Sequence, residues 1–282
     1  MLKGISYFFD PYSFFFLVLI LINASIYDLF NKRSLPTQHI VVYIFVSFFY
    51  SLIFSKFFLD SIFQSFFIML IGYFMYKKGF IGLADPILFS SLSFLVPYYE
   101  IYDYKIPFAL IAFFFSGIFF VVFSIFYYSY KIFAEIKKLE ETKYFSININ
   151  YYSLSPLIIM LFFLILNSFY QTFSLLAISI IFIFSFSAFF FTAFEKPIKY
   201  LSITKEKVSY NLLEEIIAFD FLDEKTKKII GENRVIDDLM IKKLKKAKIK
   251  KIPVYTNLLP FLPFLLAGTL FSLIFDISYF FG

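Results

Sequence analysis

Apolar residues occur in long runs along this chain, and no other feature limits its possible folds as strongly. A helix of roughly 20 residues crosses a hydrocarbon core of about 30 Å, so an apolar stretch of about 18 residues or more indicates a membrane span. Hydrophobic residues make up 61% of the 282 residues, whereas roughly 45–50% is typical of soluble domains. The sequence therefore predicts an all-α integral membrane protein and excludes an ordinary soluble globular domain.

We count eight hydrophobic segments, which predict a polytopic helical bundle of six to eight transmembrane segments. They cover approximately residues 12–30, 39–58, 61–76, 86–99, 107–130, 156–169, 172–194 and 258–280. The fourth and sixth hold only about 14 residues each, so both a full span and a short, re-entrant segment fit them. The first segment also has features of a secretory signal peptide, but the many later spans favour a segment that is retained.

The distribution of basic residues predicts the topology. If the N-terminus is outside and every segment crosses, the inside loops are about 31–38, 77–85, 131–155 and 195–256. These loops hold 23 of the 26 Lys and Arg residues, and only Lys3, Lys56 and Lys105 lie outside. Because loops rich in Lys and Arg stay in the cytoplasm, we expect a multi-pass protein of the cytoplasmic membrane with these four loops inside.

Four regions follow from this division. We expect a catalytic membrane core over 1–130, a cytoplasmic loop with additional membrane segments over 131–194, a basic cytoplasmic soluble segment over 195–256, and a final transmembrane helix over 257–282. Apolar residues at helical spacing predict helices over 211–221 and 232–249 of the soluble segment. Its lysines 242–251 favour contact with anionic membrane lipid; a role in substrate docking is the alternative, and a nucleic-acid partner is not expected.

Asp28 is the first candidate for chemistry. It lies about one turn before the cytoplasmic end of the first span, in the stretch Tyr27-Asp28-Leu29-Phe30-Asn31-Lys32-Arg33-Ser34-Leu35-Pro36-Thr37. A carboxylate at a helix C-terminus meets the negative end of the helix dipole. Pro36 then prevents the helix from continuing. Asp28 is therefore poorly placed for stability alone.

Asp85 is the second candidate, in Gly82-Leu83-Ala84-Asp85-Pro86 at the start of the fourth segment. Gly82 and Ala84 leave a thin backbone that another chain can approach closely. Asp85 also fits a purely structural role, since it occupies an N-cap-like position with Pro86 at the first helical site.

Together the two aspartates suggest a catalytic pair. The topology was derived from Lys and Arg residues alone, and it places both aspartates at the cytoplasmic boundary. Two carboxyl groups held close together share a proton, so one can act as base on a water while the other acts as acid. The sequence lacks the catalytic residues of other hydrolases. There is no Cys, and His39, the single histidine, is expected to be an interfacial residue. No zinc-peptidase, serine-triad or phosphate-loop motif is present.

The motifs resemble those of type IV prepilin peptidases. Asp28 to Thr37 is similar to their D-x-x-x-x-R-x-I-P-N element, and Gly82-Leu83-Ala84-Asp85 is similar to the motif that names the GxGD aspartic proteases. The tract Tyr255-Thr256-Asn257-Leu258-Leu259-Pro260-Phe261-Leu262-Pro263-Phe264 is similar to the entry into the last span of archaeal preflagellin and prepilin peptidases. Leu35, Thr37 and Asn257-Leu258 depart from these patterns. The resemblance covers the first hundred and the last thirty residues.

The resemblance implies an aspartic endopeptidase that removes the short basic class III signal peptide from prepilin or prearchaellin precursors, with Asp28 and Asp85 catalytic and Gly82, Ala84, Arg33 and Pro36 supporting. It implies an active site between the first and fourth segments, no metal and no organic cofactor. The absence of Cys implies the archaeal, peptidase-only type. Which precursor is cleaved, which aspartate is the base and the oligomeric state stay open.

Three alternatives remain. Intramembrane aspartates also serve proton- or cation-coupled transporters, although the second, fifth and seventh segments carry no charged residue in their interiors. A presenilin-like intramembrane protease fits Tyr27-Asp28 and Gly82-Leu83-Ala84-Asp85, but its Pro-Ala-Leu motif is missing. A scaffold without catalytic activity in a pilus or secretion machine is the third.

Overall fold

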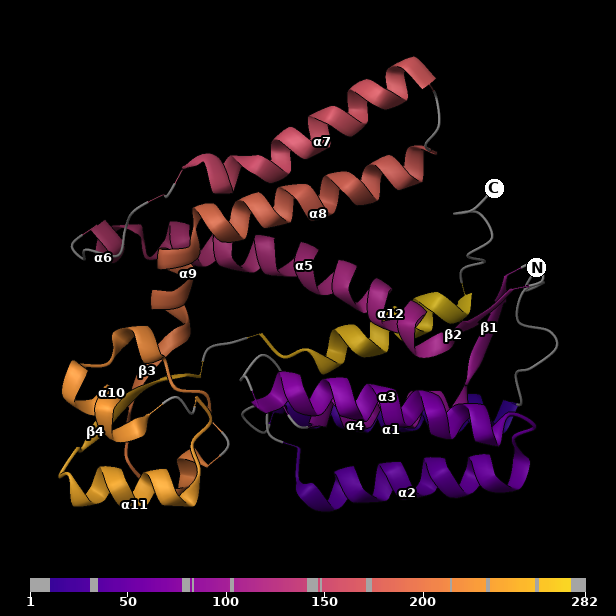
Figure 1. The fold of residues 1–282 in the computed structure, drawn as a ribbon, viewed down its shortest axis with the longest axis horizontal. Helices are drawn as coiled ribbons and strands as arrows, with labels where there is room; N and C mark the ends of the chain where they lie inside the picture. The colour runs from indigo at the N-terminus through magenta and orange to yellow at the C-terminus, as the bar shows by residue number, and fades with distance from the viewer. Residues whose placement is uncertain are drawn as a thin grey trace.

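The protein is described by a computed structural model that covers residues 11–30, 35–77, 82, 84–101, 104–140, 147, 149–170, 174–213, 215–231, 234–256 and 259–274. Apolar helices stand at all eight expected positions: α1 (Pro11–Phe30), α2 (Thr37–Phe54), α3 (Phe58–Lys77), α4 (Ala84–Leu95), α5 (Phe108–Ala134), α7 (Tyr151–Tyr170), α8 (Leu175–Ala193) and α12 (Leu262–Ile274). The fold is therefore an all-α polytopic membrane protein, as the apolar runs predict (Figure 1).

Helix lengths divide these elements into two groups. Helices α1, α3, α5 and α7 are long and apolar enough to cross a membrane, and α8 meets the same test together with α9 (Glu195–Ser202), although the two bend by 73° at their junction. Helices α2, α4 and α12 are shorter within the described ranges. The sixth apolar segment is thus longer than its apolar run suggested, because α7 has 20 residues, whereas α4 has only 12.

The eight helices alternate in direction. In Figure 1 the ends of α1, α3, α5 and α8 and the starts of α2, α4, α7 and α12 all lie on the left. This is the side at which the sequence predicted the basic loops. The opposite end carries an antiparallel hairpin of β1 (Tyr98–Ile101) and β2 (Tyr104–Pro107), which was not expected.

The last helix packs into the first part of the chain. Leu262, Leu265 and Leu273 of α12 belong to one buried cluster with residues of α1, α4 and α5. The contact with α5 is close, since a Cβ atom at Gly268 would lie 2.3 Å from the backbone nitrogen of Ser116. Helix α12, which lies in the region expected as the final transmembrane helix, therefore shares its core with helices of the expected catalytic region.

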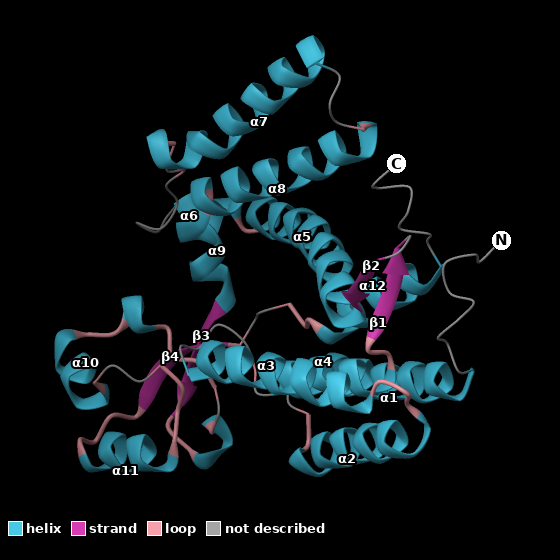
Figure 2. Ribbon diagram, turned by 45° about the vertical axis from the view of Figure 1, so that its right-hand side comes forward, coloured by secondary structure: helices cyan, strands magenta, loops and turns pink. Residues whose placement is uncertain are grey.

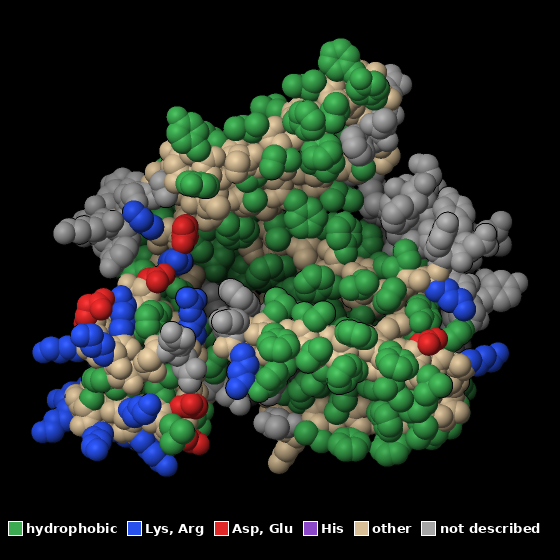
Figure 3. Space-filling model, in the orientation of Figure 1, with side chains coloured by type: hydrophobic (Ala, Val, Ile, Leu, Met, Phe, Trp, Pro, Cys, Tyr) green, Lys and Arg blue, Asp and Glu red, His purple; other side chains and the backbone are tan. Residues whose placement is uncertain are grey.

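Residues between α9 and α12 form a small unit with its own buried core (Figure 2). Strands β3 (Ile203–Lys207) and β4 (Lys251–Tyr255) pair antiparallel and bring the two ends of the unit together. The remaining elements are η1 (Tyr210–Leu212), η2 (Phe219–Phe221), α10 (Glu224–Ile230) and α11 (Asp238–Lys246). Basic side chains gather over this unit in Figure 3, while apolar side chains cover the bundle.

The prediction of a helix over residues 211–221 is wrong. That stretch holds two 3₁₀ turns, and the isolated bridges Ile216–Val235 and Ile217–Val254 lie between them. The apolar residues of this stretch face a small core, and their spacing resembles that of a helix. No helix forms, because the N–H and C=O groups of the stretch pair with the backbone of distant residues instead. The second expected helix, 232–249, is present only as the shorter α11.

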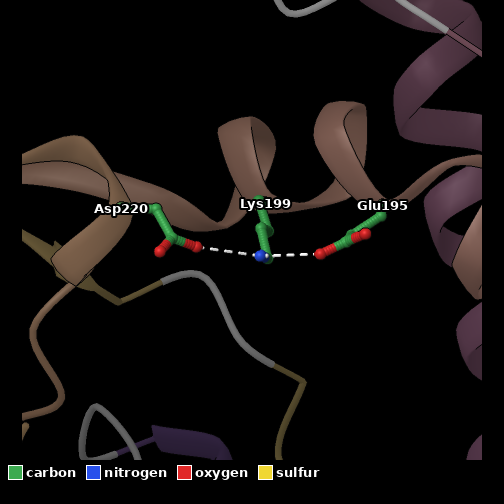
Figure 4. A network of polar contacts seen from close by, with 3 residues as sticks. All are labelled: Glu195, Lys199 and Asp220. Atoms are coloured by element: carbon green, nitrogen blue, oxygen red, sulfur yellow. Dashed lines mark hydrogen bonds and ion pairs between the residues drawn. The ribbon is translucent and has the colours of Figure 1, made fainter. Parts of the chain in front are cut away.

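A polar network joins α9 to the small unit (Figure 4). The Lys199 ammonium lies 2.7 Å from a Glu195 carboxylate oxygen and 2.9 Å from a carboxylate oxygen of Asp220. The hydrogen bond from Lys199 lowers the pKa of Asp220 below its ordinary value, and the hydrogen bond to Glu195 raises the pKa of Lys199. The junction between membrane helix and unit is therefore fixed by charge as well as by the backbone.

Candidate active site

Asp28 lies in the last turn of α1 and is buried, with only 7% of its surface exposed. One carboxylate oxygen accepts a hydrogen bond of 2.9 Å from the backbone N–H of Leu262, the first residue of α12. The first N–H groups of a helix have no partner within that helix and attract negative charge. The Asp28 carboxylate is unfavourable at the C-terminal end of α1, but it interacts favourably with the N-terminal end of α12.

Asp85 is half-buried and is the second residue of α4. One of its carboxylate oxygens accepts a hydrogen bond of 3.1 Å from the backbone N–H of Gly82. The helix begins at Ala84, two residues before the position expected for its first residue, Pro86. The prediction that Asp85 occupies the N-cap position is therefore wrong. Asp85 lies in the first turn of α4, and its carboxylate accepts a hydrogen bond from the chain that precedes the helix.

The structure brings the two aspartates together. The carboxylates of Asp28 and Asp85 lie close enough to interact electrostatically. They come from the end of α1 and the start of α4, which lie on the same side of the bundle (Figure 1). Two acidic side chains at one end of the helical bundle form the candidate site.

Packing of α3 against α4 holds Asp85 in place. Gly72 of α3 faces Pro86, and a Cβ atom at Gly72 would lie only 2.1 Å from the Pro86 Cβ. Farther along, the hydroxyls of Ser65 and Ser90 each donate to the backbone carbonyl of the other residue, at 3.0 and 3.2 Å. Small residues allow such close helix contacts in a membrane, and the polar pairs stabilise them.

The supporting motif residues have separate places. The Pro36 carbonyl accepts hydrogen bonds from the N–H groups of His39 at 2.9 Å and Ile40 at 3.3 Å, so Pro36 starts α2. Gly82 is exposed beside Asp85, and Ala84 is half-buried as the first residue of α4. Arg33 lies outside the residues that the structure describes.

A polar and aromatic cluster beside Asp28 was missed by the sequence. His39 lies against the Tyr27 ring, with ring centroids 4.6 Å apart, and near the Tyr43 ring. The Tyr43 hydroxyl donates a hydrogen bond to the Asn23 side chain. Only the spacing of Asn23 and Tyr27 on one face of the first helix hinted at this cluster. His39 therefore joins α1 to α2 as well as starting a span.

In the ranges that the structure describes, no three His, Cys, Asp or Glu side chains gather in a way that could hold a metal ion. The described residues bring to this site two carboxyl groups and the backbone N–H donors of Leu262 and Gly82. Such a pair can move protons to and from a water and a carbonyl group.

Comparison with known proteins places the site in a family. No curated protein and no solved structure showed a match to this chain. A family model, that of the type IV leader peptidase family, matches residues 15–125, which run from α1 into α5 and include both aspartates. Over residues 15–125 this chain is similar to the type IV leader peptidase family, and this match supports a peptidase of the prepilin type.

Proposed function

We propose that this protein is an aspartic endopeptidase in which Asp28 and Asp85 are the catalytic residues. The observation that supports this assignment best is the approach of their two carboxylates at one end of the bundle. Both residues fall within the region that matches the leader peptidase family. Each also accepts a hydrogen bond from a backbone N–H: Asp28 from Leu262, 234 residues away, and Asp85 from Gly82, three residues before it.

The proposed reaction is the addition of water to a peptide bond. One aspartate, as carboxylate, removes a proton from a water whose oxygen attacks the peptide carbonyl carbon. The other, as carboxylic acid, gives its proton to the carbonyl oxygen. The tetrahedral intermediate then collapses: the bond between carbon and nitrogen breaks, and the leaving nitrogen takes the proton that the first aspartate removed from the water. The second aspartate recovers its proton from a hydroxyl of the intermediate. Because the two groups titrate as a pair, neither is assigned as the base.

The proposed substrate is a precursor with a short basic leader followed by an apolar helix. A site at the membrane boundary suits this substrate, because the apolar helix can stay in lipid while the leader stays in water. The concentration of basic residues in the loops at the aspartate end supports a cytoplasmic location for the site. The lack of Cys in this sequence supports the peptidase-only, archaeal type, which acts on pilin or archaellin precursors.

Co-expression with candidate precursors from the same genome tests this function directly. We expect the wild-type protein to shift the mobility of its precursor, and Asp28→Asn and Asp85→Asn each to abolish the shift while membrane insertion is unchanged. Asp60→Asn is the matched control, because Asp60 lies in the first turn of α3 at the other end of the bundle. Near-normal processing by either catalytic-site variant would exclude the proposed pair.

The mechanism has a separate test in purified protein. We expect cleavage in detergent to follow a bell-shaped dependence on pH, with both limbs set by the aspartate pair. Serine-directed, cysteine-directed and chelating reagents are expected to leave the rate unchanged. Loss of activity with a chelator would contradict the two-carboxylate mechanism even if both aspartates proved essential.

A further inference from the structure

We propose that the entry into α12, residues 259–262, positions the aspartate pair: the backbone N–H of Leu262 holds Asp28, and the ring of Phe261 fixes this segment against α4. This inference rests on the proposed function, because it concerns the geometry of the same two carboxyl groups. It adds a segment far outside the region that matches the family, which ends at residue 125.

The bond between Leu262 and Asp28 is the first support. Its two residues are 234 positions apart, and both are buried, with 3% of Leu262 and 7% of Asp28 exposed. A hydrogen bond to a charged acceptor that is shielded from water is stronger than an ordinary one. This N–H is also at the first helical position of α12, where it has no acceptor within its own helix. The contact therefore satisfies both groups and fixes the Asp28 carboxylate relative to α12.

Phe261 supplies the second support, because its ring contacts the helix that carries the other aspartate. Its centroid lies 6.3 Å from that of Phe89 in α4 and 5.6 Å from that of Phe120 in α5. Phe89 stands four residues after Asp85, so it lies one helical turn along the same face. Adjacent residues of the entry segment thus contact the two aspartate-bearing helices: Leu262 contacts α1 and Phe261 contacts α4.

The entry segment is itself held on both sides. After it, α12 packs closely on α5 through Gly268 and Ser116. Before it, the Tyr255 N–H donates to the Ile216 carbonyl at 2.9 Å, and the hydroxyls of Thr204 and Thr256 lie 2.6 Å apart. The described chain on either side of the segment therefore has fixed contacts, with the small unit at residues 255–256 and with α5 at Gly268.

A support of this kind should affect turnover more than substrate binding. The precursor does not need the Leu262 N–H to enter the site, but the chemical step needs the two carboxyl groups at a set separation. Misplacement of a reacting group by about 1 Å can cost roughly a hundredfold in rate. Leu262 is accordingly a positioning residue that acts through Asp28.

The first test compares Leu262→Pro with Leu262→Met. Proline removes the N–H and is well tolerated at the first position of a helix, while methionine keeps the N–H and nearly the same volume. We expect kcat for a purified precursor to fall about tenfold to a hundredfold in Leu262→Pro with KM within about twofold, and both to stay near wild type in Leu262→Met. Unchanged kcat in a folded Leu262→Pro would overturn the proposal.

A second measurement covers the case in which Leu262→Pro does not fold. Incorporation of the α-hydroxy analogue of leucine at position 262 replaces the N–H by an ester oxygen and keeps the side chain. The matched control is the same replacement at Leu266, in the next turn of α12. We expect the ester at 262 to lower kcat at least about tenfold more than the ester at 266. Equal effects at the two positions would overturn the proposal.

A double-mutant cycle separates this inference from the proposed function. Thermal unfolding in detergent is measured for the 262 ester, for Asp28→Ala and for the two combined. If Leu262 and Asp28 interact as proposed, the ester lowers Tm less in the Asp28→Ala background than in the wild-type background. Additive shifts in Tm would contradict the contact. Coupled shifts in a protein that cleaves no precursor would retain the contact but reject the peptidase function.

Discussion

Gly82 determines how closely another chain can approach Asp85. It is exposed, and its N–H donates to the Asp85 carboxylate. Among the described residues, a Cβ atom at this position would meet only that carboxylate, at 3.6 Å. This is an ordinary van der Waals contact, so a methyl group fits in the protein without substrate. We therefore expect any requirement for glycine at this position to come from the bound substrate.

Gly82→Ala is therefore expected to leave stability unchanged to within about 0.5 kcal/mol. KM for the precursor should rise, because the added methyl group occupies space that the substrate backbone uses beside Asp85. Thermal unfolding and steady-state cleavage measured on the same preparation check the two parts of this expectation. Equal kcat/KM for variant and wild type would show that the substrate does not approach Gly82.

At the residue level, the sequence identified Asp28 and Asp85 but not what holds them. Motif spacing and the charge of neighbouring loops are local properties, and they were sufficient to place both aspartates at one boundary. The donor to Asp28 is a backbone group 234 residues away, and no side-chain type reveals a backbone N–H. The same limit explains why the cluster of Tyr27, His39 and Tyr43 was missed, since ring contacts depend on how α1 and α2 pack.

Among the elements, α3 and α4 pack closely through a single small residue. Gly72 lies directly against Pro86, the residue after Asp85, and is buried there. Gly117 in α5 provides a natural comparison, because a Cβ atom added there would meet nothing within 4 Å. Both glycines are inside apolar helices, so they differ mainly in what they face.

We expect Gly72→Ala to destabilise the protein by about 1–3 kcal/mol, because the methyl group forces α3 and α4 apart. Cleavage should fall as well, since Asp85 moves with Pro86. Gly117→Ala should be neutral or stabilising by up to about 1 kcal/mol, because alanine favours the helix. Unfolding in detergent measures both variants; similar stability of the two would mean that α3 and α4 separate without cost.

The junction between α9 and the small unit should depend on pH through Lys199 and Asp220. The pKa of Asp220 is lowered, so its contribution is present above the ordinary carboxyl value of 3.8 and is lost as pH falls through the lower, folded value. The pKa of Lys199 is raised, so its contribution is present below 10.5 and is lost as pH rises through the higher, folded value. The interaction therefore contributes from about pH 4 to about pH 10.

Asp220→Asn should accordingly lower the free energy of unfolding by only about 0.2–1 kcal/mol at pH 7, since both side chains are partly exposed and screened by water. The difference from wild type should shrink as pH falls below 3.8 and vanish once Asp220 of the wild type is itself protonated at its lowered, folded pKa. Thermal unfolding of the two proteins across this range measures the effect. A difference that persists at low pH would mean that the residue stabilises by packing instead of charge.

Elements could be predicted from the sequence where the membrane dictates them. All eight apolar segments are helices, because a backbone in lipid must satisfy its hydrogen bonds within the segment. The sequence did not reveal β1–β2, β3–β4 or the two 3₁₀ turns, which form in water, where short strands and turns compete closely with helix. The pairing of β3 with β4 also joins residues about fifty positions apart, and such pairings leave no local pattern.

For the whole molecule, the alternation of eight helices and the distribution of charge agree. The helix ends next to the aspartates share one side with the basic unit between α9 and α12 (Figures 1 and 3). The last helix belongs to the same core as α1, α4 and α5, so the membrane core is built from both ends of the chain.

The last prediction concerns which side of the membrane holds the site. The chain has no Cys, so a single introduced Cys reports its own location. Ser209, between β3 and η1, lies on the aspartate side, and Lys56, between α2 and α3, lies on the opposite side. Because basic loops stay in the cytoplasm, we expect an impermeant thiol reagent to label Lys56→Cys in intact cells and Ser209→Cys only after permeabilisation. The reverse pattern would put both aspartates outside the cell, where a leader that remains in the cytoplasm cannot reach them.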